Sequence, residues 1–220
     1  MTTSAWELTK QRSGYHFDNF KFDPDQDKVT TLGNIDPFWQ DELANIIELA
    51  RPKTWRTRGQ GSDRPAEEYN QEEYDLEEQG YGKDYVISDL TWEVPETFNK
   101  IAVWFGMDNC KMRLHVQRPG QVWNLHLDKL EKWNPADPSR VMRVMIALNN
   151  WEQGHFFSYG NYVHTGWLAG DVTTFDWRNL PHSTANAGHG PRITLQMTGV
   201  VTDQTQNFLR ILRSKSPYRV

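Results

Sequence analysis

Apolar and polar residues alternate with a period of two in three segments of the second half of the chain. Every second residue is apolar over 112–117, 143–148 and 192–197, and Arg, His, Gln and Thr stand at many of the positions between. This pattern is typical of β-strands with one face toward a core and the other toward polar surroundings. Gly, Pro and Asn separate the segments. We therefore expect an antiparallel sandwich or barrel over 111–200, with polar residues lining its mouth or lumen.

A helical spacing replaces this alternation at three other places. Pro37 opens an amphipathic segment that Pro52 ends, and Pro95 opens a second segment that Gly106 ends. Proline suits the first turn of a helix, and glycine suits the position just after the last turn. A third apolar stripe predicts a helix near 203–214. We expect these helices to pack on the β-structure through their apolar faces.

The length of 220 residues suits a single domain, residues 1–220. Its expected parts are a helical buttress over 1–110, the β core over 111–200 and the C-terminal helix within 201–220. An acidic insertion, residues 56–84, interrupts the buttress, and its stretch 63–78 holds eight Asp or Glu residues. Such a segment is either a solvated insertion or a lid over a site.

Composition narrows the classes of function. The chain has 24 Lys and Arg against 29 Asp and Glu, a net charge of −5, which argues against a general nucleic-acid partner. No apolar run is long enough for a membrane span, and the first residues lack the pattern of a secretory signal. A single cysteine suits a reducing compartment, so we expect a cytoplasmic protein, either monomer or homodimer. Ten tryptophans indicate a large aromatic core, an aromatic pocket, or both.

A possible metal site follows the second predicted strand. His126 and Asp128 stand two residues apart, so their side chains can point to one side of a strand. His182 comes after a later predicted strand, 172–177, and the turn 178–181 that follows it. It can supply a third ligand. Two imidazoles and one carboxylate leave three open positions on an octahedral metal, which favours Fe(II) with oxygen chemistry over structural zinc. A second H-x-D, His16 to Asp18, precedes any convincing strand and is interpreted as structural.

Two polar residues follow His182 at a suggestive distance. Arg192 comes ten residues later, and Thr194 two residues after that. If the two strands form a hairpin, Arg192 and Thr194 share the polar face to which His182 points. A buried guanidinium needs an anionic partner to offset its desolvation. That partner is either a carboxylate of the protein or a ligand carboxylate held bidentately.

The set His126-x-Asp128, His182 and Arg192 resembles the Fe(II)- and 2-oxoglutarate-dependent oxygenase superfamily. Its pattern is H-x-D, a distal His and an Arg about ten residues later. The resemblance implies a mainly β fold (α+β), a double-stranded β-helix of the jelly-roll or cupin type, buttressed by N-terminal helices. It also implies that His126, Asp128 and His182 bind Fe(II), and that Arg192, assisted by Thr194, binds the distal carboxylate of 2-oxoglutarate.

One group within that superfamily, the prolyl hydroxylases, is similar in the approach to the metal site. The run Gln117-x-x-Gly120-x-x-Trp123-x-x-His126-x-Asp128 resembles their Y-x-x-G-x-x-Y-x-x-H-x-D. Gln117 and Trp123 replace the two tyrosines. The contact that the first tyrosine usually makes to the cosubstrate therefore has a different residue here.

A second group, the aspartyl/asparaginyl β-hydroxylases, is similar over other residues. Pro119-Gly120 followed by His126 matches its P-G-x-x-x-x-x-H, and the segment 170–176 before His182 matches its G-x-x-x-x-F-D…H. That group lacks the metal-binding acid, whereas Asp128 is present here. It also carries an Arg and a His on the strand that matches 140–148, where this chain keeps Arg143 but has Met145.

The resemblance implies a hydroxylase that inserts oxygen from O₂ into a C–H bond while 2-oxoglutarate becomes succinate and CO₂. A carboxylate at position 128 favours hydroxylation, because related halogenases have a small residue there. We expect the substrate to be an amino-acid or peptidyl side chain, in a small molecule, peptide or protein. His115 and Gln117 are expected near the cosubstrate, and Arg143 and Trp123 near the substrate.

Three alternatives have distinct signatures. A DNA- or RNA-dealkylating oxygenase would usually carry a second Arg six residues after the first, but position 198 is Thr and the chain is acidic. A cupin-like metalloenzyme that does not use 2-oxoglutarate would share the barrel but has no need of Arg192. A non-catalytic, metal-stabilised binding protein has no need of the open ligand set with that Arg. Turnover of 2-oxoglutarate separates the last two from an oxygenase.

Overall fold

The computed structural model describes residues 30–54, 85–160 and 162–215. The acidic insertion 56–84 lies outside the described residues, and so does the H-x-D at His16. The three predicted helices and the three predicted alternating strands all fall on helices and strands. Within the described part of the chain, no helix is long and apolar enough to cross a membrane.

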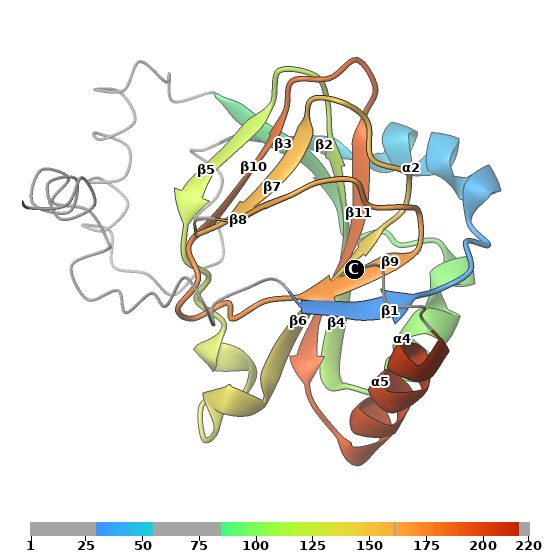
Figure 1. Ribbon diagram of the computed structural model, residues 1–220, viewed down its shortest axis with the longest axis vertical. Coiled ribbons are helices and arrows are strands. Elements are labelled where there is room, and N and C mark those ends of the chain that lie inside the picture. The colour runs from blue at the N-terminus through green and yellow to red at the C-terminus, as the bar shows by residue number, and fades with distance from the viewer. Residues whose placement is uncertain (1–29, 55–84, 161, 216–220) are drawn as a thin grey trace, which may run out of the picture.

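Two antiparallel sheets face each other as a double-stranded β-helix, and helices cover the outer side of the larger sheet (Figure 1). The larger sheet has the strand order β1-β9-β6-β11-β4-β3-β2, and the smaller one has the order β5-β10-β7-β8. The strands of the larger sheet are β1 (Thr30–Asn34), β2 (Arg51–Thr54), β3 (Val86–Thr91), β4 (Asp108–Gln117), β6 (Val141–Ala147), β9 (Asp171–Thr174) and β11 (Arg192–Val200). Those of the smaller sheet are β5 (Val122–His126), β7 (His155–Tyr159), β8 (Tyr162–His164) and β10 (His182–Asn186).

The helices pack on the apolar face of the larger sheet. They are η1 (Gln40–Glu42) with α2 (Leu43–Leu49), η2 (Glu96–Phe98) with α4 (Asn99–Phe105), and α5 (Asp203–Lys215). One core cluster joins buried helix residues such as Trp39, Ile46 and Phe105 to Leu114 and Leu195 of the sheet. Two short helices, η3 (Glu131–Trp133) and η4 (Pro138–Arg140), lie between β5 and β6. The alternation in β4, β6 and β11 thus assigns every second side chain to this helix-covered core.

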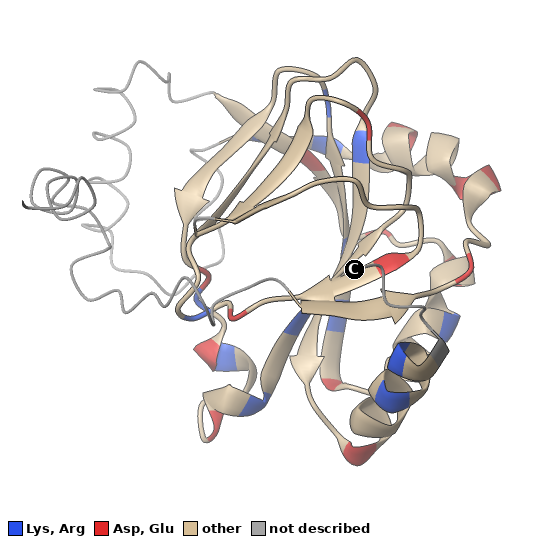
Figure 2. Cartoon of the chain, in the orientation of Figure 1, with Lys and Arg blue, Asp and Glu red and all other residues tan. Residues whose placement is uncertain are grey.

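The other face of β4, β6 and β11 looks toward the smaller sheet and carries polar and charged side chains. Both faces are covered, so all nine residues of β11 are buried. Blue segments interrupt strands of the larger sheet in Figure 2, where Lys and Arg are coloured. Because a buried cation must be compensated, this inner face is where chemistry is expected.

The N-terminal part differs from the expected helical buttress in one respect. Besides its helices it supplies β1, β2 and β3, which form both edges of the larger sheet. Pro52 follows the first helix as expected, but it lies within β2, an edge strand where a missing N–H costs no ladder hydrogen bond on the open side. These strands are four to six residues long and lack a clean period of two, so their sequences gave no strand signal.

Gly170 joins the N-terminal segment to the barrel, and its replacement should be costly. Its φ is +91°, and a Cβ there would lie 2.1 Å from the carbonyl oxygen of Ile35. We expect Gly170→Ala to lower the free energy of unfolding by at least about 2 kcal/mol, from backbone strain and the backbone clash together. Gly120→Ala is the matched control, because Gly120 has a φ of +86° and open space around it. Chemical denaturation measures both, and equal losses would show that the clash contributes nothing.

Candidate metal centre

Two histidines and one aspartate lie close together at one end of the smaller sheet. They face the polar inner side of the larger sheet. His126 ends β5 and His182 begins β10, and the two residues are directly paired across these strands. Their ring centroids are 4.3 Å apart. Asp128 lies two residues past β5, with Oδ1 3.9 Å from His126 Nε2 and Oδ2 3.5 Å from His182 Nε2. The three ligand atoms lie within 4.8 Å of one another, so this triad could hold a metal ion.

Backbone carbonyls orient both imidazoles. His126 Nδ1 is 2.7 Å from the carbonyl oxygen of Asn124, and His182 Nδ1 is 3.2 Å from that of Leu180. A carbonyl oxygen only accepts, so each Nδ1 carries the proton and donates it. Each Nε2 then holds its lone pair on the side of Asp128. This is the second shell that fixes the tautomer of metal-binding histidines in proteins.

Arg143 of β6 forms an ion pair with Asp128. Burial by itself raises the pKa of the Asp128 carboxyl, but Arg143 and the two histidines outweigh burial and hold that pKa well below its usual range. The carboxylate is therefore ionised at neutral pH and ready to bind a cation. Arg143 Nε also donates to Thr198 Oγ1 at 3.2 Å, which fixes the guanidinium against β11. Arg143 was expected near the substrate, and in the structure its guanidinium contacts the Asp128 carboxylate of the triad.

Replacement of Arg143 should therefore make the free energy of unfolding depend on bound metal. Arg143→Gln leaves a buried carboxylate without its cation, and we expect a loss of about 3–5 kcal/mol in the free energy of unfolding of the metal-free protein. Mn(II) should restore a large part of this loss, because a divalent ion replaces the missing positive charge beside Asp128. Arg140→Gln, an exposed neighbour, should change stability by about 0.5 kcal/mol or less. Denaturation with and without Mn(II) checks this, and a metal effect no larger than in the unchanged protein would contradict it.

Arg192 lies across the cavity from the triad and is held by Gln117. Its Nε donates to Gln117 Oε1 at 3.1 Å, while Gln117 Nε2 donates to Thr184 Oγ1 at 3.0 Å. Burial lowers the pKa of Arg192 to about 10, so the guanidinium stays charged. Phe157 lies under the guanidinium, 5.4 Å from its carbon to the ring centroid. Among the described residues no carboxylate forms an ion pair with Arg192.

Gln117, which was expected near the cosubstrate, has its side-chain amide hydrogen-bonded within the protein. It is fully buried and spends its amide on Arg192, Thr184 and the backbone of Ile87. The amide positions the guanidinium without neutralising its charge, since an amide oxygen carries no full negative charge. Arg192 is therefore aimed and still able to bind an anion.

Tyr159, which the sequence analysis missed, completes this end of the cavity. It is the residue of β7 paired with His182 on the other side of β10, and it is fully buried. Its hydroxyl lies near Thr173 but has no hydrogen-bond partner of good geometry in the described part of the chain, and burial raises its pKa far above the usual value, so it stays a neutral donor. Tyr159 and Arg192 line the same cavity together with Thr194. A buried hydroxyl without a partner is costly, which indicates a ligand here.

The cavity at the triad is also lined by His115, Thr194 and Trp123. His115 of β4 is paired with Thr194 of β11, and its Nε2 is buried without a hydrogen-bond partner. Burial, together with Arg113 and Arg192, lowers the pKa of His115 well below its usual value, so its ring is neutral. Trp123 stacks on His126 with ring centroids 5.6 Å apart and an interplanar angle of 20°. It packs beside a ligand of the triad and thereby limits the cavity.

The expected hairpin between the strand of His182 and the strand of Arg192 is not formed. β10 pairs with β5 and β7 in the smaller sheet, whereas β11 pairs with β4 and β6 in the larger one. The chain between them crosses from one sheet to the other. His182 and Arg192 therefore face each other from opposite walls of the barrel, which leaves space between them for a ligand.

Two small cavities share four of their lining residues. The first has a volume of about 30 Å³ and is lined by the triad, and the second has about 20 Å³ and includes Tyr159 and Trp167. Each holds a few water molecules at most. Both are lined by Met145, Phe157, Arg192 and Thr194, so the side chains of these residues separate the two spaces.

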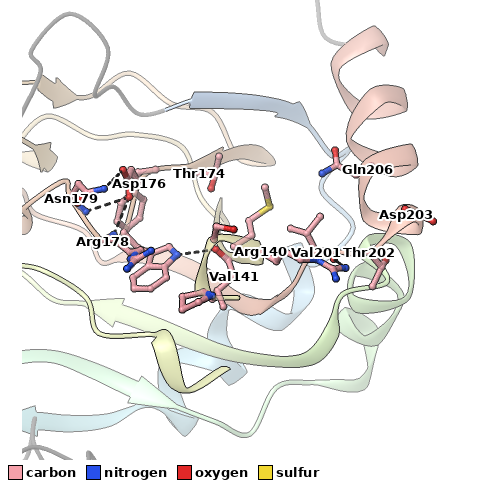
Figure 3. A pocket seen from close by; sticks show the side chains of 15 residues that line it. Arg140, Val141, Thr174, Asp176, Arg178, Asn179, Val201, Thr202, Asp203 and Gln206 are labelled. Atoms are coloured by element: carbon pink, nitrogen blue, oxygen red, sulfur yellow. Dashed lines mark hydrogen bonds between the residues drawn. The ribbon is translucent and has the colours of Figure 1, made fainter. Parts of the chain in front are cut away.

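A larger cavity of about 850 Å³ lies elsewhere, beside η4 and the first turn of α5 (Figure 3). It shares only Phe175 with the lining of the triad cavity. Asp176, a lining carboxylate, is occupied by its own turn, where it accepts hydrogen bonds from Arg178 and Asn179 (Figure 3). No histidine or cysteine lines this space, so size alone does not make it the reaction site.

The donor set at the triad fits a divalent transition metal with open positions. Two neutral imidazole nitrogens and one ionised carboxylate oxygen are the ligands that non-haem Fe(II) sites use, and they leave room for further ligands. Tyr159, whose hydroxyl has no hydrogen-bond partner among the described residues, lines the second cavity together with Arg192. The residues present therefore fit both a metal and an anionic second ligand.

The chain was compared with known proteins. No protein-family model and no curated protein matches the chain. Among solved structures, the chain is similar to a viral collagen prolyl hydroxylase from Paramecium Bursaria Chlorella virus-1 in complex with 2OG. That match has 16% identity, covers 51% of this chain and 79% of the other, and has a TM-score of 0.35.

Two further solved structures are similar over comparable lengths. One is a predicted oxalate decarboxylase from Thermotoga maritima, with 14% identity, 52% and 81% of the two chains covered and a TM-score of 0.34. The other is a Cupin 2 conserved barrel domain protein from Salinispora arenicola, with 13% identity, 56% and 84% covered and a TM-score of 0.33. These similarities concern the double-stranded β-helix, and the chemistry of this chain has to be argued from its own residues.

Proposed function

We propose that this protein is an Fe(II)- and 2-oxoglutarate-dependent dioxygenase that hydroxylates a C–H bond of an amino-acid or peptidyl side chain. One observation carries the proposal. An open triad of His126, Asp128 and His182 shares its cavity with Arg192, a buried cation that forms no ion pair with any described carboxylate. Metal binding alone does not require such a guanidinium. A dicarboxylate that chelates the metal requires both the metal at one end and the guanidinium at the other.

The triad would hold Fe(II) on one face. His126 and His182 present Nε2 atoms whose tautomers are fixed by backbone carbonyls, and Asp128 presents an oxygen while Arg143 holds the carboxylate in place. With its cosubstrate bound, such an iron centre supplies oxygen activation coupled to the conversion of 2-oxoglutarate to succinate and CO₂. The protein supplies the ligands, their orientation and a cavity with little water.

Arg192 would bind the distal carboxylate of 2-oxoglutarate as a bidentate partner. Gln117 holds its Nε, which leaves the terminal nitrogens of the guanidinium for the ligand. Tyr159 would donate its partnerless hydroxyl to the same carboxylate, and Thr194 lies on the strand face between Arg192 and the metal. His115, paired with Thr194, lies next to this path with an unused ring nitrogen.

The two small cavities match the two ends of this cosubstrate. The keto-acid end would occupy the space at the triad, and the distal carboxylate would occupy the space beside Tyr159. The side chains of Met145 and Phe157, which line both spaces, would move to join them. Two of these four shared residues are apolar, so the joined cavity excludes water around the charged groups and strengthens their interactions.

The wider assignments belong to the same proposal. A cytoplasmic location fits Fe(II) chemistry in a reducing compartment, and the acidic net charge makes a nucleic-acid substrate unfavourable. The alternative is a cupin-like metalloenzyme without 2-oxoglutarate, or a metal-stabilised binding protein. Both would share the triad but would give the guanidinium of Arg192 no ligand.

The test is turnover of 2-oxoglutarate by the purified protein. Fe(II), ascorbate and 2-oxoglutarate are supplied in air with a panel of free amino acids and short peptides, and succinate is measured. We expect iron-dependent succinate formation, slow without a substrate and faster with the right one. Absence of succinate under all conditions, with iron bound and the protein folded, would favour the alternatives.

A further inference from the structure

The inner face of β4 and β11 carries the same motif twice, related by a local two-fold axis. Arg113 and Gln117 stand four residues apart on β4, and Arg192 and Gln196 stand four residues apart on β11. The strands are antiparallel, with Arg192 opposite Gln117 and Gln196 opposite Arg113. The axis passes through the pair of His115 and Thr194. Each strand thus contributes one Arg and one Gln to one polar face.

The hydrogen bonds repeat as well. Arg192 Nε donates to Gln117 Oε1 at 3.1 Å, and Arg113 Nη2 donates to Gln196 Oε1 at 3.0 Å. In both pairs an amide oxygen holds one edge of a guanidinium without neutralising it. At about 3.3 Å per residue, the two pairs lie about 13 Å apart along β11, with the triad facing them from the opposite wall. The cavity therefore has an arginine at each end.

Arg113 has a group that needs a ligand. Its Nε is fully shielded from solvent and has no hydrogen-bond partner among the described residues. Trp92 and Trp123 flank the guanidinium, 5.5 and 5.9 Å from its carbon to the ring centroids. Burial and the neighbouring Arg143 lower the pKa of Arg113 to about 9, which still leaves it charged at neutral pH. Among the described residues no carboxylate forms an ion pair with it.

The charges of the cavity are unbalanced. Three guanidiniums, those of Arg113, Arg143 and Arg192, line the triad cavity against the single carboxylate of Asp128. His115 is neutral, and 2-oxoglutarate would compensate a divalent metal. A positive excess therefore remains in a space with little water, where it is expensive. Arg143 is paired with Asp128, so Arg113 is the remaining cation, and it lines the triad cavity but not the cavity that includes Tyr159.

We propose that Arg113, held by Gln196, is the carboxylate-binding residue for the primary substrate. This inference rests on the proposed function and gives it a substrate class: molecules that carry a carboxylate near the carbon to be hydroxylated. A planar guanidinium with a free Nε edge fits a carboxylate as a bidentate partner. Trp92 and Trp123 flank the guanidinium, and Arg113 lines the triad cavity, so a carboxylate would approach it from that cavity. Arg113 replaces Arg143 as the residue that selects the substrate.

The experiment measures anion binding without turnover. Protein loaded with Fe(II) and 2-oxoglutarate under argon is titrated with acetate, and with acetamide as the neutral isostere, while tryptophan fluorescence is recorded. Because Trp92 and Trp123 flank Arg113, we expect a saturable change with acetate and none with acetamide. A carboxylate response that equals the acetamide response would overturn the proposal.

Two variants test the residue in different ways. Arg113→Gln removes the cation and should weaken acetate binding about tenfold or more, as expected for the loss of hydrogen bonds from a charged donor. Gln196→Glu changes one amide to a carboxylate that pairs with Arg113 internally, so it should block acetate while keeping the packing. Far-ultraviolet circular dichroism checks the fold of both. If either folded variant binds acetate as the unchanged protein does, the proposal is wrong.

Arg192→Gln is the mirror control and separates this inference from the proposed function. It should weaken 2-oxoglutarate and keep the acetate response that depends on Arg113. If 2-oxoglutarate does not bind at all while acetate still binds through Arg113, the proposed function fails and the anion site stands. If 2-oxoglutarate binds as expected while acetate binding ignores Arg113, the anion site fails and the proposed function stands.

A second set of probes identifies the source of the carboxylate. N-acetyl-L-alanine presents an α-carboxylate, as a free amino acid does, and N-acetyl-L-aspartic acid α-amide presents a side-chain carboxylate, as an acidic peptide does. Binding of either that is lost in Arg113→Gln supports the proposal, and the tighter of the two names the substrate type. Equal binding of both in Arg113→Gln and in the unchanged protein would count against it.

Discussion

Replacement of His182 by alanine is expected to abolish metal binding and 2-oxoglutarate turnover while the protein stays folded. In the proposed site the imidazole supplies one of three protein ligands, and its Nε2 is already oriented toward Asp128 by the hydrogen bond from Nδ1 to Leu180. Loss of a residue that merely supports a metal ligand costs about 10–100-fold in affinity, so loss of a ligand should exceed about 100-fold. His126→Ala should behave in the same way.

The measurement is direct titration with Fe(II) under argon, followed by a succinate assay in air. His189→Ala is the control, because His189 is exposed and lies on the turn between β10 and β11, away from the triad. It should bind metal and turn over 2-oxoglutarate as the unchanged protein does. Retention of both properties in folded His182→Ala would refute the assignment of the triad.

Replacement of Arg192 by glutamine is expected to weaken 2-oxoglutarate far more than metal. Two hydrogen bonds from a charged, buried guanidinium to a carboxylate are each worth about 1.5–3 kcal/mol, so the dissociation constant should rise about 100-fold or more. Metal affinity should change little, because Arg192 contacts none of the three ligands in any described hydrogen bond or ion pair. Arg192→Lys keeps the charge but not the planar fork, and it should recover only part of the loss.

Calorimetric titration with 2-oxoglutarate in the presence of Mn(II) measures this difference without turnover. Arg178→Gln is the matched control, since Arg178 is exposed and lines the larger cavity beside α5. An equal loss of metal and 2-oxoglutarate in Arg192→Gln would mean that the residue supports the whole fold of the site. An unchanged affinity for 2-oxoglutarate would remove its anchoring role.

Much of the β core could be predicted from the sequence because its strands carry a strict period of two. In β4, β6 and β11 one face is apolar and the other mostly polar, and that pattern is typical of strands with one face on a core. The strands β1, β2 and β3, which lie at or next to the edges of the larger sheet, were not predicted, because short strands there need no such pattern. The crossing between β10 and β11 escaped for another reason. The five residues between these strands, 187–191, are compatible with a hairpin and with a step from one sheet to the other.

The residues of the candidate site were predicted to different degrees. His126 and Asp128 are two residues apart, and His182 and Arg192 are ten residues apart, and these short spacings singled them out. The pairing of Arg143 with Asp128 depends on how β6 lies against the end of β5, which no spacing reveals. Tyr159 stands in an aromatic strand and looks like core, and only its partnerless hydroxyl distinguishes it.

Arg113 shows how a signal can be present in the sequence and still be missed. The segments R-L-H-V-Q and R-I-T-L-Q, at 113–117 and 192–196, repeat the same spacing of Arg and Gln. The repeat gains meaning only when β4 and β11 are known to be antiparallel neighbours in the register that sets each Arg opposite a Gln. Strand register is a tertiary property, so this relation became visible in the structure.

The most direct test of the central claim is an anaerobic titration of the purified protein with Fe(II) and then with 2-oxoglutarate, followed by visible absorption. If His126, Asp128 and His182 hold the metal and Arg192 anchors the cosubstrate, a charge-transfer band appears as the chelate forms. The same band should require about 100-fold more 2-oxoglutarate in Arg192→Gln. A folded, iron-loaded protein that gives no band at any 2-oxoglutarate concentration would contradict the account.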